Sequence, residues 1–235
     1  MSDSVHSIET HSASLSTGLC ELFPRGALIA ELRGRGDPAA LYPNEARHLQ
    51  KAVQKRLEEF AAGRMCARLL LREFGIHDFA LEVGAHRQPL WPIDLVGSIT
   101  HTTGFCAAVA APKNHLRSVG IDTEIAGSVK TSLWPGICTA LETAWLRSLP
   151  ESEQLAAATL IFSAKEAFYK CQFAFTQERL SFHDVSVDLP AWGEKRGGFR
   201  IVANRCIEFE RHAALPLPGQ YLFHEQFISS GIALA

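Results

Sequence analysis

The sequence predicts an α+β fold built from two similar halves. Helical patterns span residues 43–74 and 152–174, and short apolar stretches typical of strands flank each of them. A Pro-Lys-Asn-His-Leu-Arg segment at 112–117 separates the two groups of elements. We therefore expect residues 19–115 and 116–235 to form two halves in a pseudo-twofold arrangement, each with a long helix packed on a small, mainly antiparallel sheet. The active site would lie in the cleft between them.

The composition is that of an ordinary globular protein. The chain has 235 residues, of which 47% are hydrophobic and 20% are charged, so it can bury a proper core. Its formal net charge is −2, so an anionic partner has to be met by a local basic patch. This balance argues against a dedicated nucleic-acid-binding protein.

The cysteines and the N-terminus favour a cytoplasmic protein without a membrane partner. The chain has 6 cysteines, none in a C-x-x-C pair, and we expect them to be reduced thiols. Residues 1–18 form a polar tail without a basic region followed by an apolar run, and no later stretch offers about 18 uninterrupted apolar residues.

In the N-terminal half, a helix is expected from Pro43 onward, with Asn44 as its candidate cap. Gly63 is expected to interrupt this helix and Gly75 to end it. Strands are expected at 19–23, 27–32, 80–83 and, as a pair, within 99–111. Most basic residues of the helix are ordinary solvated groups. Arg64 is different because it follows Gly63, where the missing side chain lets a ligand or another backbone come close.

The stretch 119–125 alternates with period two, as a strand does. One face takes its apolar residues, which puts Asp122 and Glu124 together on the other face, about 6.5–7 Å apart. Two like charges on one strand face repel each other, so either water screens them or a cation holds them. Hard cations such as Mg²⁺ prefer carboxylate oxygen.

The helical stretch around residues 160–171 buries one apolar stripe and places Glu166 and Lys170 one turn apart on its flank. A surface ion pair at this spacing is the commonest interpretation. Strands are expected after this helix at 185–189, 199–202, 206–209 and 221–227. His101 closes a Gly-Ser-Ile-Thr-His stretch, and a single histidine in such a place is more often a hydrogen-bonded core residue than a catalytic group.

Taken together, four motifs resemble those of the 4′-phosphopantetheinyl transferases, in particular the large monomeric members with two halves that activate peptide, siderophore or fatty-acid synthases. The motifs are the basic and Gly-Arg stretch at 55–68, the Gly-Ser-Ile-Thr-His stretch at 97–101, G-x-D-x-E at 120–124 and F-S-x-K-E-A-x-x-K at 162–170. The resemblance spans about residues 43 to 171, and the last two motifs are its most specific part.

The resemblance assigns roles to individual residues. It implies that Asp122, Glu124 and Glu166 bind Mg²⁺, with Mn²⁺ as an alternative, and that Glu166 also serves as the base. His101 and Lys170 would contact the phosphates of coenzyme A and take part in catalysis. The further coenzyme A contacts that it implies are Lys55, Arg56, Arg64, Ser98, Thr100 and Lys165. Gln88 stands where relatives often carry a basic residue, and Arg87 is the neighbouring candidate to replace it.

The implied function is transfer of 4′-phosphopantetheine from coenzyme A to a serine of an apo acyl or peptidyl carrier protein, with release of 3′,5′-ADP, by a monomer. Coenzyme A carries several phosphates, so fixed cations suit its binding, and Mg²⁺ suits charge stabilisation in phosphoryl transfer. Two alternatives remain at this point. A metal-dependent nucleotide or phosphodiester hydrolase would use the same carboxylates, and a non-catalytic coenzyme A or carrier-binding module would need only the basic groups.

Overall fold

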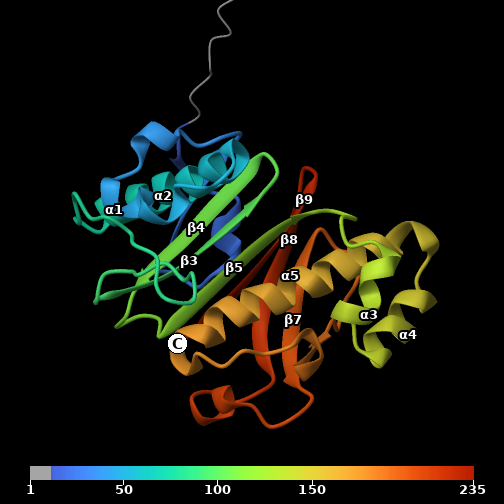
Figure 1. Ribbon diagram of the computed structural model, residues 1–235. Helices are drawn as coiled ribbons and strands as arrows, with labels where there is room; N and C mark the ends of the chain where they lie inside the picture. The colour runs from blue at the N-terminus through green and yellow to red at the C-terminus, as the bar shows by residue number, and fades with distance from the viewer. Residues whose placement is uncertain (1–11) are drawn as a thin grey trace, which may run out of the picture.

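The computed structural model describes residues 12–235, and its first sheet has four antiparallel strands in the order β1-β2-β4-β3. The strands are β1 (Ser14–Leu15), β2 (Leu28–Arg33), β3 (Leu95–Thr102) and β4 (Phe105–Pro112). One face of this sheet is covered by the long helix α2 (Gln54–Glu73), which follows the short helix α1 (Pro43–Ala46) (Figure 1).

The second sheet has five antiparallel strands in the order β5-β9-β8-β7-β6. The strands are β5 (Ser118–Ile125), β6 (Val185–Asp188), β7 (Arg196–Ala203), β8 (Leu217–His224) and β9 (Phe227–Leu234). The longest helix, α5 (Glu151–Thr176), crosses this sheet, and α3 (Trp134–Ile137) and α4 (Ala140–Ser148) lie at its N-terminal end (Figure 1). The predicted α+β class with two halves of helix and antiparallel sheet is confirmed.

Helix α2 packs closely on its sheet because both surfaces carry small side chains. Ala62 and Cys66 of the helix are buried in one cluster with Ala108 and Ala110 of β4. The helix runs unbroken through Gly63, so the expected interruption is wrong. A Cβ at Gly63 would lie 3.0 Å from Cγ2 of Ile99, and the missing side chain therefore serves contact between α2 and β3.

Helix α5 lies directly on β5. A Cβ at Gly120 would come within 1.9 Å of the carbonyl oxygen of Ala167, and the Ser118 hydroxyl donates to the Cys171 carbonyl at 2.8 Å. Ser118, Gly120 and Asp122 thus face α5, whereas Ile121 is buried in the core cluster between the two sheets. The alternation predicted for 119–125 is confirmed, and it places the carboxylate of Asp122 under α5.

Strands β3 and β5 lie side by side where the two sheets meet, and side-chain hydroxyls join them. The N–H of Ile121 donates to Ser98 Oγ at 3.2 Å, and the N–H of Thr123 donates to Thr100 Oγ1 at 2.9 Å. These hydroxyls satisfy edge N–H groups of β5 that would otherwise have no acceptor. The seam between the halves is therefore fixed next to Asp122.

Several expected elements differ from the observed ones. Residues 19–23 contain a 3₁₀ helix, Leu19–Leu22, whose leucines enter the core between the sheets. The stretch 80–83 contributes only an isolated bridge between Val83 and Pro89. The 3₁₀ helix Glu208–Arg211 replaces the strand expected at 206–209. The remaining 3₁₀ helices are Pro38–Ala40, Arg47–Leu49, Thr131–Leu133 and Phe182–Asp184.

The helix expected from Pro43 onward is divided, because α1 and the 3₁₀ turn after it end before α2 begins at Gln54. Tyr42, rather than Asn44, is the N-cap of α1. Strand β9 was not expected, because it is buried on both faces and so lacks an alternating pattern. Residues 1–11 of the expected polar tail lie outside the described residues, and Ser14–Leu15 pairs with β2. None of the helices within residues 12–235 is both long and apolar enough to cross a bilayer.

Candidate active site

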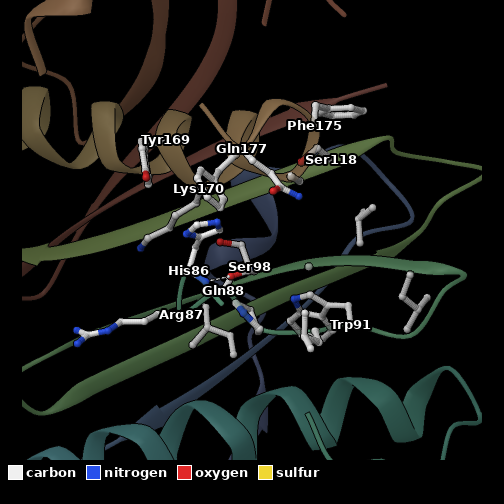
Figure 2. Close-up of a pocket in the computed structure, with 18 of the residues that line it drawn as sticks. His86, Arg87, Gln88, Trp91, Ser98, Ser118, Tyr169, Lys170, Phe175 and Gln177 are labelled. Carbon is white, nitrogen blue, oxygen red and sulfur yellow. Dashed lines mark hydrogen bonds between the residues drawn. The ribbon is translucent and has the colours of Figure 1, made fainter. Parts of the chain in front are cut away.

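A cleft of about 810 Å³ lies between α5 and the segment that leads into β3. Glu166, Tyr169 and Lys170 of α5 form one wall. The opposite wall comes from residues 86–91 and from β3, including Ser98. Figure 2 shows Lys170 reaching from α5 across β5, with Gln88 and Trp91 on the other side of the cleft. The cleft is thus built from both halves of the chain, at their seam.

At one end of this cleft, Lys170 binds Asp122. The ammonium nitrogen lies 2.8 Å from Asp122 Oδ1 and 3.0 Å from the carbonyl oxygen of Ile121. Oδ1 of Asp122 also accepts from the Thr100 hydroxyl at 3.4 Å. The second oxygen, Oδ2, is buried and has no hydrogen-bond partner among residues 12–235. An orphan carboxylate oxygen in a buried position is costly unless something positive reaches it.

Two further carboxylates share the electrostatic field of Asp122. Burial, followed by the charge of Asp122, raises the pKa of Glu124 to about 7, while Lys170 acts in the opposite direction. The pKa of Glu166 is also raised, again by burial first and by Asp122 second. The expected three acidic groups are therefore near neighbours, on β5 and on the helix that covers it.

The three carboxylates do not form a finished metal cage. Within the described part of the chain, no three side chains of the His, Cys, Asp and Glu types are arranged closely enough to hold an ion as they stand. The donor set nevertheless fits Mg²⁺, because it consists of carboxylate oxygens and includes the orphan Oδ2 of Asp122. In the structure, the cation beside Asp122 is the ammonium of Lys170.

A cluster of basic side chains lies where the start of α2 meets the end of β3. Arg56 Nη1 is 2.9 Å from His101 Nε2, and Glu59 lies within 3.9 Å of both side chains. Burial and, second, the charge of Arg56 lower the pKa of His101, so its ring is neutral at pH 7 and can accept from the guanidinium. The side chain of Lys55 is 70% exposed beside them. These groups offer an anion at least two cations and an imidazole.

Comparison with known proteins agrees with this geometry. Residues 44–111 match the 4′-phosphopantetheinyl transferase N-terminal domain, and residues 118–223 match the 4′-phosphopantetheinyl transferase superfamily. The chain is 34% identical over 199 residues to the 4′-phosphopantetheinyl transferase Npt of Nocardia iowensis, an alignment that covers 85% of each protein. The chain belongs to the 4′-phosphopantetheinyl transferase family.

Two other relatives cover less of the chain. The 4′-phosphopantetheinyl transferase PptT of Mycobacterium tuberculosis is 35% identical over 154 residues, which is 64% of this chain and 67% of PptT. Enterobactin synthase component D of Escherichia coli K12 is 39% identical over 124 residues, 52% of this chain and 57% of that protein. A phosphopantetheinyl transferase moves the phosphopantetheine group of coenzyme A to carrier proteins, generally with a divalent metal, and nothing supports the hydrolase alternative.

Two basic residues that the transferase motifs place at coenzyme A are buried in the structure. Arg64 is 6% exposed, its guanidinium lies 3.9 Å from the ring centre of Phe60, and its Nε donates to the Leu81 carbonyl at 2.9 Å. Lys165 is 2% exposed and binds Glu142 at 2.7 Å. Neither side chain reaches the cleft, so we assign both to the support of the helices that carry the site.

Three other residues expected to contact coenzyme A instead make hydrogen bonds within the protein. The Ser98 and Thr100 hydroxyls are buried at the seam with β5, although Ser98 also lines the cleft. Gln88 Oε1 accepts from the N–H of His86 at 3.0 Å, which folds its side chain over Gly84. Arg87 is exposed, at a left-handed φ of 67°, and lines the cleft, so it is the available cation of this loop.

The cleft also contains aromatic side chains that were not predicted from the sequence. Tyr169 and Phe173 stack at 5.5 Å on α5, and the His86 ring meets Phe173 edge-on at 5.6 Å. Trp91 lies against Gly97, where a Cβ would come within 2.4 Å of the indole. Tyr169 and Phe173 are four residues apart on the same flank of α5 as Glu166, which is the sequence signal that could have indicated them.

Proposed function

We propose that this cleft transfers 4′-phosphopantetheine from coenzyme A to the serine of an apo acyl or peptidyl carrier protein through Asp122, Glu124, Glu166 and Lys170. The observation that carries the assignment is the orphan Oδ2 of Asp122, beside two carboxylates of raised pKa and one lysine at the wall of the cleft. Acidic groups of perturbed pKa at a cleft are typical of a catalytic site, and Glu166 lines this one.

The phosphates of coenzyme A would lie between two sets of basic side chains. Lys170 serves the pyrophosphate, because it lines the cleft with Glu166 and its ammonium binds Asp122. Arg56, Lys55 and the neutral His101 form the second set, at the outer edge of the seam. Arg87 adds a cation on the loop opposite α5. Phosphoryl transfer depends mainly on such positioning and on charge stabilisation.

Asp122, Glu124 and Glu166 would hold Mg²⁺, which supplies a Lewis acid for the phosphoryl oxygens when bound. Glu166 accepts the proton of the carrier serine, and burial raises its pKa, which makes it a stronger base than an exposed carboxylate. The serine oxygen then forms a bond to the phosphorus that bears the pantetheine arm. The bond from this phosphorus to the oxygen of 3′,5′-ADP breaks, and Lys170 neutralises the departing charge.

We also propose an oligomeric state, a compartment and a class of partner. Both walls of the cleft come from one chain, so a monomer is sufficient for the site. A cytoplasmic protein that acts on acidic, helical carrier proteins is the form we expect. The third reading, a non-catalytic module that binds coenzyme A, would leave Asp122, Glu124 and Glu166 without a role.

The test is a carrier modification assay. The full chain is incubated with coenzyme A, Mg²⁺ and a panel of apo acyl and peptidyl carrier proteins, and each carrier is weighed by mass spectrometry. We expect each accepted carrier to gain the mass of one phosphopantetheine group. We expect no gain in mass when EDTA replaces Mg²⁺. Carriers of unchanged mass together with released nucleotide would contradict the proposal in favour of hydrolysis. Bound coenzyme A without either product would favour the binding module.

A further inference from the structure

The ammonium of Lys170 has the surroundings of a bound cation. It lies 2.8 Å from a carboxylate oxygen of Asp122 and 3.0 Å from the carbonyl oxygen of Ile121. Its charge also stabilises the ionised forms of Glu124 and Glu166, since it lowers the pKa of each against the effect of burial. The lysine is therefore bonded to one carboxylate of the site and acts on the other two through its charge.

The same carboxylates are the ligands that we expect to hold the divalent ion. A divalent ion and an ammonium beside Asp122 would repel each other strongly, because like charges at such distances interact across little water. Among residues 12–235, with Lys170 bonded to Asp122, no three His, Cys, Asp or Glu side chains are arranged to hold an ion. The arrangement therefore accommodates one of the two cations at a time.

Lys170 is able to leave without any change in the backbone. Its side chain is 27% exposed, whereas that of Asp122 is 6% exposed, so the lysine is the mobile member of the pair. A lysine carries its charge on a flexible four-carbon stem. Figure 2 shows this stem extending from α5 at the wall of the cleft, where a phosphate of coenzyme A would be within reach.

We propose that Lys170 is an internal placeholder for the divalent ion. It binds Asp122 in the unloaded enzyme, gives up its place when the ion binds, and transfers its ammonium to a phosphate of coenzyme A. This inference rests on the proposed function of the cleft. It makes the binding of metal and of coenzyme A mutually favourable, because the phosphate receives the lysine that the metal displaces.

The first test is the affinity for Mn²⁺ alone, measured by isothermal titration calorimetry on the full chain without coenzyme A. Lys170→Met removes the competing cation, so we expect this variant to bind Mn²⁺ about tenfold more tightly than the wild type, within the usual range of coupling. The matched control is Lys130→Met, which changes the net charge equally at an exposed lysine that bonds to the Gly127 carbonyl. An affinity of Lys170→Met equal to or below that of the wild type would overturn the inference.

The second test uses the wild-type chain and so does not depend on the folding of a variant. Lysines are labelled by reductive methylation with and without saturating Mg²⁺, and the rate at each lysine is read by peptide mass spectrometry. We expect Mg²⁺ to increase the rate at Lys170 several-fold and coenzyme A to lower it again. Lys165 should stay unlabelled, and Lys130 should react equally in both conditions. An unchanged or slower reaction of Lys170 with Mg²⁺ would contradict the exchange.

The two tests separate this inference from the proposed function. If the chain binds no divalent ion even with coenzyme A present, the metal-dependent transfer itself fails. If it binds the ion and modifies carrier proteins, while Lys170→Met gains no affinity and Lys170 labelling does not respond, only the placeholder role fails.

Discussion

Helix α5 contributes the lysines of two ion pairs. Their nitrogen–oxygen distances are nearly the same, but one pair is buried in the interior and the other is partly exposed to solvent. Lys165 binds Glu142 at 2.7 Å, with both side chains at most 4% exposed. Lys170 binds Asp122 at 2.8 Å, with the lysine 27% exposed. The ammonium of Lys165 also donates to the carbonyl oxygens of Ile137 and Phe182, and Glu142 accepts further N–H groups from Thr139 and Val187. The interior pair is thus fully satisfied.

The pair in the cleft is incomplete by comparison. Asp122 keeps one buried oxygen without a partner among the described residues, and its lysine reaches solvent. A buried polar network whose members are all satisfied makes a structure rigid, whereas an unsatisfied member in a cleft is available for a ligand. The first pair therefore holds α4, α5 and β6 together, and the second is the pair to which we assign the chemistry.

The largest effect is expected from breaking the interior pair. Lys165→Met leaves the carboxylate of Glu142 buried without its cation, which should lower the free energy of unfolding by about 3–5 kcal/mol. Denaturant unfolding measures this loss. Lys130→Met, at an exposed position, serves as the control and should change it by less than about 0.5 kcal/mol. A stable Lys165→Met variant with impaired coenzyme A binding would contradict this assignment and show that Lys165 contacts coenzyme A.

Breaking the incomplete pair should affect activity rather than stability. Asp122→Asn keeps the shape of the side chain and removes its charge, so we expect kcat/KM for carrier modification to fall by about 10²–10³-fold. Calorimetry should show a parallel loss of Mn²⁺ affinity. Asp188→Asn, at an exposed carboxylate that pairs with Arg200, is the matched control and should keep full activity. Nearly normal activity of Asp122→Asn would show that Asp122 is not part of the active site.

The two pairs also show what the sequence could predict. The period-two pattern of 119–125 correctly placed Asp122 opposite the apolar face, and the helical pattern placed Lys170 on a flank beside Glu166, but neither pattern predicted the contact between Lys170 and Asp122. The same motif gave no means of telling Lys165 from Lys170. Lys165 turns the other way because Glu142 is buried there, and a partner 23 residues distant is set by tertiary packing.

The missed elements have the same physical origin. Gly63 signals a close approach in the sequence, but only the fold shows that the neighbour is Ile99 and not a ligand. Strand β9 carries Ser229, Ser230 and Gly231 in a stretch that is buried on both faces, so neither alternation nor an apolar run marks it. Sequence periodicity reports which face is buried, and it does not report what covers that face.

A smaller effect is expected at the seam that positions Asp122. Thr100→Val leaves the buried N–H of Thr123 without an acceptor, at a cost of about 1–3 kcal/mol in unfolding free energy. Because we assign the Thr100 hydroxyl to the joining of β3 and β5, the KM for coenzyme A should stay within about threefold of the wild type. Ser98→Ala is the companion variant, since Ser98 accepts from Ile121 in the same way. A large rise in KM with unchanged stability would show that the hydroxyl contacts coenzyme A instead.

The smallest effect is the contribution of Glu124 to the pH dependence of stability. Burial raises the pKa of Glu124 from 4.5 to about 7, so between these values the folded chain keeps a proton that the unfolded chain has lost. The contribution of Glu124 to the free energy of unfolding should therefore fall as the pH rises from about 4.5 to about 7, with Glu166 acting in the same sense. His101 and His224, whose pKa values are lowered by burial, act in the opposite sense. Unfolding curves in EDTA at several pH values measure the slope, which Glu124→Gln should reduce. A wild-type slope that Glu124→Gln leaves unchanged would show that this carboxyl is ionised throughout, and that the two ion pairs differ less than their surroundings indicate.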